Sequence, residues 1–230
     1  MGEIILPGNP PIEVLLRRSA QARRISLRLS RLDGRVTMTL PRHVAVREAR
    51  AFAREKEAWL RAHLSSQPQI VPLRSGAWLP VEGRMLRISA GQGRSVRVAD
   101  QDILIPGAED RYGARLSGYL KVLARDRLTE ASDRHAAALG RQYARLTLRD
   151  TRSRWGSCTH DGGLMYSWRL VMAPPEVLDY VAAHEVAHLA EMNHSQAFWS
   201  LVTQLYGNWK PARNWLRDEG AELHRYRFGD

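Results

Sequence analysis

Cysteine is almost absent from this chain of 230 residues, in which Cys158 is the single copy. One cysteine cannot close an internal disulfide, so stability must come from core packing, with or without a bound metal. No apolar run reaches the roughly 20 residues that a membrane-spanning helix needs, and Pro7 interrupts the first apolar stretch before it has the length of a signal peptide. These absences predict a soluble, cytoplasmic protein.

Lysine is also scarce, because Lys56, Lys121 and Lys210 are the only copies, yet the net charge is +11. Arginine supplies the surplus, which is +7 in residues 1–70, +5 in residues 71–150 and −1 in residues 151–230. A basic N-terminal region can attract an anionic partner such as nucleic acid, whereas scattered arginines can equally be a solvated surface. The charge pattern alone leaves both interpretations open.

Residues 1–108 are predicted to form a β-rich region with one helix. Apolar residues alternate with polar ones at several places in 12–41, and Asp33-Gly34 supplies a hairpin turn. The Ala-, Arg- and Glu-rich segment 42–64 predicts an amphipathic helix, and turn residues punctuate short strands in 73–107.

Residues 109–230 are predicted to form a second domain that carries the chemistry. Helical spacing over 109–139 ends at Gly140, and Pro174-Pro175 begins a further helix. Strands are expected at 145–149 and 164–173. The mixture of helices and strands predicts an α+β protein.

The segment from His184 to His188 has the pattern H-E-x-x-H on the predicted helix after Pro175. At about 100° per residue, the two histidines lie on one face with Glu185 at its flank. Two imidazoles one turn apart can share a Zn²⁺ ion, and the glutamate can take a proton from a zinc-activated water. Apolar residues surround the helix, so a metal would offset the cost of burying these polar groups.

His194 is the preferred third ligand, because the helix can end near Met192-Asn193 and let the chain turn back toward the metal. Ser195 can then cap the next helix. Glu191 competes for the same role, although it follows His188 closely on one helix. Cys158 could be a fourth, inhibitory ligand, or simply a small packed residue. The other five histidines are expected at the surface: His43, His63, His135, His160 and His224.

Several further segments resemble the YgjP-like, SprT-related group of zinc metallopeptidases. They are Arg154-Trp155-Gly156-Ser157-Cys158, Trp168-Arg169-Leu170, Ala173-Pro174, Asp179-Tyr180-Val181, the His184 to His188 motif, and Asn193-His194-Ser195 through Phe198-Trp199. The resemblance implies a zincin-like catalytic domain, preceded by a smaller region of strands and helices. It also implies zinc on His184, His188 and His194, with catalysis by Glu185. The wider SprT-like group includes proteases that act on DNA-associated proteins, which would suit the basic charge by analogy.

The sequence therefore predicts a zinc-dependent metallopeptidase that hydrolyses peptide bonds by a zinc-activated water, with Glu185 as the general base. Two alternatives stay open. A zinc-dependent hydrolase of non-peptide amides or esters would use the same residues, and a nucleic-acid-binding protein could hold the metal for structure alone. The group that stabilises the oxyanion is not ranked by the sequence, and Arg213, Tyr206 and His224 are its candidates.

Overall fold

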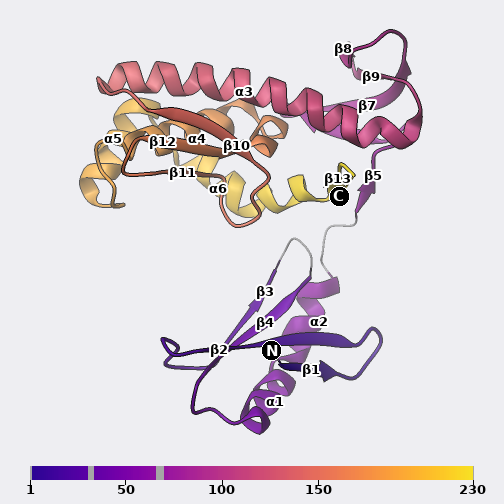
Figure 1. The fold of residues 1–230 in the computed structure, drawn as a ribbon, viewed down its shortest axis with the longest axis vertical. Coiled ribbons are helices and arrows are strands. Elements are labelled where there is room, and N and C mark those ends of the chain that lie inside the picture. The colour runs from indigo at the N-terminus through magenta and orange to yellow at the C-terminus, as the bar shows by residue number, and fades with distance from the viewer. Residues whose placement is uncertain (1, 31–33, 66–69, 230) are drawn as a thin grey trace. The chain divides into compact units, whose positions relative to one another are not determined.

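The computed structural model describes residues 2–30, 34–65 and 70–229, and it is an α+β protein as the sequence predicts (Figure 1). The chain divides into two compact units, Met1–Gln69 and Ile70–Asp230. The predicted division after residue 108 does not coincide with this one, because the strands of 78–106 share a hydrophobic core with the helix that follows them. Among the described residues, no helix is long and apolar enough to cross a membrane.

The first unit is a four-stranded sheet packed against two helices. Its strands have the order β1-β2-β4-β3, with β2 and β4 parallel and the other neighbours antiparallel. Alternate residues of β2 are buried, and Ala49 and Leu60 of the helices join the same core. The elements are β1 (Gly2–Leu6), β2 (Ile12–Ser19), β3 (Ser26–Leu29), β4 (Val36–Pro41), α1 (Val46–Glu55) and α2 (Glu57–Ser65).

Two details of the first unit differ from the sequence prediction. The expected helix over 42–64 is broken at Lys56, whose non-helical backbone (φ −92°, ψ 3°) separates α1 from α2. Strand β1 was not predicted, and it forms because Ile4 and Leu6 are buried where β1 pairs with β2. The antiparallel pairing of β3 with β4 is confirmed, while Asp33 of the predicted turn lies outside the described residues.

The second unit begins with a sheet of strand order β6-β7-β9-β8, which lies beside the long helix α3 (Figure 1). Ile88 and Ile103 from this sheet and Leu116 and Leu120 from α3 are fully buried in one core. As predicted, α3 ends at Gly140, which takes the left-handed conformation (φ 67°). The elements are β6 (Trp78–Val81), β7 (Arg84–Gly91), β8 (Arg97–Ala99), β9 (Asp102–Pro106), η1 (Glu109–Arg111) and α3 (Tyr112–Leu139).

After α3, the chain forms a three-stranded sheet. Its strand order is β10-β12-β11, so β11 is an edge strand. These strands are β10 (Arg145–Arg149), β11 (Gly156–Cys158) and β12 (Gly163–Ser167). The strand expected over 164–173 stops at Ser167, and Trp168–Met172 forms the 3-10 helix η2 instead. All five residues of η2 are buried, so they lack the alternation that a half-buried strand requires.

The remaining elements complete the second unit. They are α4 (Pro175–Ala187), α5 (Gln196–Tyr206), α6 (Lys210–Asp218), η3 (Gly220–His224) and β13 (Tyr226–Arg227), which pairs in parallel with β5 (Val71–Pro72). The buried guanidinium of Arg169 holds this end of the chain, because it donates hydrogen bonds to the carbonyls of Leu223 and Tyr226. Asp150 balances its charge through two further hydrogen bonds.

Candidate metal centre

The end of α4 places the two histidines of the H-E-x-x-H pattern. Helix α4 starts at Pro175 and ends at Ala187, earlier than the predicted end near Met192. His188 is the C-cap residue, and the backbone N–H groups of Leu189 and Ala190 bond to carbonyls three residues back, which tightens the chain into a turn. Ser195 caps α5 as predicted, with its side chain accepting a hydrogen bond from the Phe198 N–H at 3.3 Å. His194 therefore lies between two helix ends.

The structure brings together the three histidines that the spacing singles out. Within the described part of the chain, one ligand atom from each of His184, His188 and His194 lies within 4.8 Å of the other two, and no further His, Cys, Asp or Glu joins this group. The Nε2 atoms of His184 and His194 are 3.1 Å apart. Glu191 contributes its backbone carbonyl instead of its carboxylate, since that carbonyl accepts a hydrogen bond from His188 Nδ1 at 2.9 Å.

These three residues fit a metal ion. Two ligands of a tetrahedral zinc ion lie roughly 3.3 Å apart, close to the observed contact. The hydrogen bond to Glu191 fixes the proton of His188 on Nδ1 and leaves Nε2 free to coordinate. Burial, reinforced by the neighbouring histidines, lowers the pKa of His184 to about 3 and also lowers the pKa of His188, so both rings stay neutral as ligands must. His184 Nδ1 is buried and has no hydrogen-bond partner among the described residues.

Phe198 forms the apolar floor of the histidine group. Its fully buried ring lies 4.5 Å from the ring of His188, 4.8 Å from that of His194 and 4.9 Å from that of His184. Trp199 forms a wall, with its ring 5.8 Å from the rings of His184 and His194. Such packing fixes the orientation of the three imidazoles before any ligand binds.

Glu185 lies next to this group on α4, buried against strand β11. A Cβ atom on Gly156 would come within 2.6 Å of Glu185 Cγ and Oε1, so the strand approaches the carboxylate as closely as glycine allows. Burial raises the pKa of Glu185 to about 8, and the positive charge of Arg154 opposes this rise. A metal cation nearby would also act to lower it.

Residues 23–219 match the family model of the YgjP-like metallopeptidase domain. The chain belongs to the YgjP-like metallopeptidase family. The match covers the histidine group and most of both compact units, and it confirms the resemblance that the sequence motifs indicate. A member of this family is a hydrolase that needs a metal ion and acts on peptides or proteins, and the three-histidine group could bind that ion.

No curated protein matches the chain of this YgjP-like metallopeptidase. Among solved structures, it is similar to the crystal structure of the metallopeptidase zymogen of Pyrococcus abyssi abylysin. The two are 19% identical with a TM-score of 0.37, and the match covers 44% of this chain and 98% of that chain.

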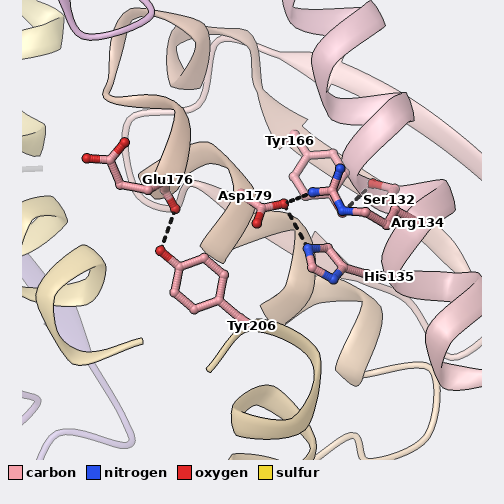
Figure 2. A network of polar contacts seen from close by, with 7 residues as sticks. All are labelled: Ser132, Arg134, His135, Tyr166, Glu176, Asp179 and Tyr206. Atoms are coloured by element: carbon pink, nitrogen blue, oxygen red, sulfur yellow. Dashed lines mark hydrogen bonds and ion pairs between the residues drawn. The ribbon is translucent and has the colours of Figure 1, made fainter. Parts of the chain in front are cut away.

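A polar network ties α4 of the metallopeptidase to α3 (Figure 2). Asp179, five residues before His184, bonds to His135 Nε2 at 2.8 Å and to the guanidinium of Arg134. His135 is only 4% exposed and His224 only 9%, so the prediction that both lie at the surface is wrong. His135 is buried because Asp179 pairs with it, and His224 because its ring packs on Trp155 with 5.4 Å between centroids.

The three candidates for stabilising the oxyanion in the YgjP-like metallopeptidase differ in how available they are to a substrate. Tyr206 donates its hydroxyl to the carbonyl of Glu176 at 2.9 Å (Figure 2), and His224 packs against Trp155. Arg213 is exposed and stacks on Trp199, the wall of the histidine group.

Cys158 lies outside the histidine group, and burial raises the pKa of its thiol to about 11. The resemblance motifs include Gly156 and Phe198 but assign neither a role, since both roles depend on contacts between separate elements.

Proposed function

We propose that this chain is a zinc-dependent metallopeptidase in which His184, His188 and His194 hold the zinc ion and Glu185 is the general base. The observation that carries the proposal is the convergence of three imidazoles within 4.8 Å, on a floor formed by Phe198. Imidazole ligands suit zinc better than magnesium or calcium, which prefer oxygen. Three protein ligands leave a fourth position open, as in catalytic zinc sites.

The chain's own residues perform the proton transfers. When bound, zinc supplies Lewis acidity, which polarises a carbonyl oxygen and makes water a stronger acid. Glu185 takes a proton from the attacking water and then delivers it to the leaving amine. Its burial against Gly156 holds the carboxylate in place and brings its pKa near neutrality, where a group can both accept and release a proton.

The substrate backbone is expected to bind beside β11. This strand is at the edge of its sheet, and Gly156 on it lies against Glu185. An extended peptide can add to such an edge by main-chain hydrogen bonds. This arrangement favours a peptide over a small non-peptide amide or ester, which would gain little from an open strand.

The test compares wild type with Glu185→Gln, using Glu191→Gln as the matched control. Glu185→Gln should keep about one zinc per chain and lose roughly 10²–10⁴-fold in the rate of peptide hydrolysis. Glu191→Gln should keep both, because only its backbone carbonyl contacts the histidine group. Zinc content by elemental analysis and hydrolysis of an unstructured protein substrate are measured on the same preparations.

Four outcomes would contradict parts of this proposal. Loss of zinc in Glu185→Gln would make the residue a ligand, and unchanged hydrolysis would remove it from the mechanism. Full zinc affinity in His194→Ala would exclude the third ligand. Turnover of simple esters or amides without any peptide cleavage would favour the non-peptide hydrolase.

A further inference from the structure

Arg213 on α6 is ordered by an aromatic platform beside the histidine group. Its guanidinium carbon lies 5.2 Å from the ring centre of Trp199 and 5.6 Å from that of Trp209. The two tryptophan rings stack on each other at 4.3 Å. Stacking on two indoles restricts the long arginine side chain and contributes a favourable cation–π interaction.

The Arg213 guanidinium has no hydrogen-bond or ion-pair partner in the part of the chain that the structure describes, although the side chain is ordered and exposed. Arg217, one turn further along α6, differs in this respect because its guanidinium pairs with Asp218 at 2.9 Å. Arg213 thus presents five N–H donors to solvent in a fixed fork.

One aromatic ring, that of Trp199, adjoins both this fork and the histidines. Trp199 contacts Arg213 and has its ring centre 5.8 Å from those of both His184 and His194. An extended peptide advances about 3.3–3.6 Å per residue. A group held by Arg213 would therefore be about one to three residues from a peptide bond positioned at the histidines.

We propose that Arg213 is a specificity-determining residue that binds a carboxylate of the substrate, one to three residues from the scissile bond. The inference rests on the proposed peptidase function and narrows its substrate class to peptides with a carboxylate at that distance. The carboxylate is either the free C-terminus of the peptide or the side chain of Asp or Glu. Arginine suits both, because its planar fork donates two parallel hydrogen bonds to one carboxylate.

The test measures equilibrium binding to the metal-free protein, so that neither turnover nor coordination contributes. Three hexapeptides of one neutral sequence serve as probes: one with a free C-terminal carboxylate, one with a C-terminal amide, and one with the amide and an aspartate as its last residue. Calorimetry gives the dissociation constant of each for wild type, Arg213→Gln and Arg217→Gln. Cleavage of the same peptides by the zinc-loaded protein is recorded separately.

Wild type should bind at least one of the carboxylate peptides about tenfold more tightly than the neutral amide, since charge-assisted hydrogen bonds are the stronger kind. Arg213→Gln should abolish this preference and leave binding of the amide unchanged, whereas Arg217→Gln should behave as wild type. Comparison of the free C-terminus with aspartate identifies the source of the carboxylate.

Equal binding of all three peptides by wild type would overturn the proposal, and so would an equal loss for all three in Arg213→Gln. Selective binding that depends on Arg213, without cleavage of any peptide by the zinc-loaded protein, would support the subsite while contradicting the peptidase function.

Discussion

Gly156 shows how one missing side chain shapes the candidate site. Since a Cβ atom there would lie 2.6 Å from Glu185 Cγ and Oε1, Gly156→Ala must displace either the carboxylate or strand β11. We expect this variant to keep its zinc and to lose about tenfold or more in peptide hydrolysis, because misplacing a catalytic group by about 1 Å can cost 10²-fold. Zinc content and kcat are the measurements.

Gly118 offers the matched control for that substitution. It lies on α3 with an ordinary helical backbone, and an added Cβ would have no neighbour within 4 Å. Gly118→Ala should leave hydrolysis unchanged and raise stability by up to about 1 kcal/mol, owing to the higher helix propensity of alanine. Equal activities for the two variants would contradict the steric argument at Gly156.

His224 should make the stability of the fold depend on pH. Burial, followed by the charge of Arg169, lowers its pKa from 6.5 to about 4, although Asp150 acts in the opposite direction. Between pH 6.5 and 4 the unfolded chain therefore binds a proton at His224 that the folded protein excludes. The stabilising effect of the neutral ring is complete above pH 6.5 and is lost as the pH falls toward 4.

His224→Gln removes this titration, so its free energy of unfolding should vary less between pH 7 and 4 than that of wild type. Denaturant unfolding of both metal-free proteins at several pH values gives the two slopes. Since His184 and His188 titrate in the same direction in both proteins, only the difference between the slopes reports on His224. Identical slopes would contradict the assignment.

The residues of the site differ in how far the sequence predicts them. The spacing of His184, His188 and His194 anticipates their convergence, because it depends on a single helix and the turn after it. The approach of Gly156 to Glu185 could not be predicted, since it results from packing between segments distant in the sequence. The floor formed by Phe198 was not predicted either, because it depends on how α5 packs against α4. The burial of His135 was missed because its partner Asp179 lies 44 residues away.

Helices α3 and α4 are joined by the contact of Asp179 with His135 and Arg134. Asp179→Asn should lower the free energy of unfolding by about 1–3 kcal/mol, because it weakens a charge-assisted bond to the buried His135. Arg134→Gln should cost less than about 1 kcal/mol, since Arg134 is 55% exposed and exposed ion pairs contribute little. Urea unfolding measures both variants, and an effect of Arg134→Gln as large as that of Asp179→Asn would oppose this ranking.

Elements with a regular hydrophobic pattern were predicted better than their boundaries. The pattern located α3 and its end at Gly140, and it located strand β10. It missed the break at Lys56, where a short-range backbone change interrupts an otherwise continuous helical composition. It also extended a strand into Trp168–Met172, because a fully buried run has no period that separates a strand from a 3-10 helix.

At the scale of the whole molecule, the three histidines lie entirely within the second compact unit. A ligand that binds the folded state alone stabilises it in proportion to the logarithm of its concentration. Zinc should therefore raise the melting temperature of the second unit, and a chelator should reverse the shift. His188→Ala should melt at the same temperature with and without zinc. Calorimetry measures these shifts, and a zinc-dependent shift in His188→Ala would show binding elsewhere.

The surplus of positive charge lies in the first 150 residues of the sequence, before the segment that supplies the three histidines. Nucleic-acid binding by the N-terminal region stays a prediction, and so does a cytoplasmic location. Salt-dependent DNA binding by wild type, retained in Glu185→Gln, would be the expected result if the charge serves an anionic partner.

The pairing of β13 with β5 brings the last strand of the second unit beside its first strand. Tyr226 lies opposite Val71, and Arg169 fastens the segment just before β13. Because the two strands run parallel, a linker from Gly229 to Ile70 would have to run back along the pair. New ends could be opened at Gly93, around which a side chain would meet nothing within 4 Å. We expect a circular permutant made in this way to keep the strand pairings and the histidine group, because it breaks the chain only at an exposed turn.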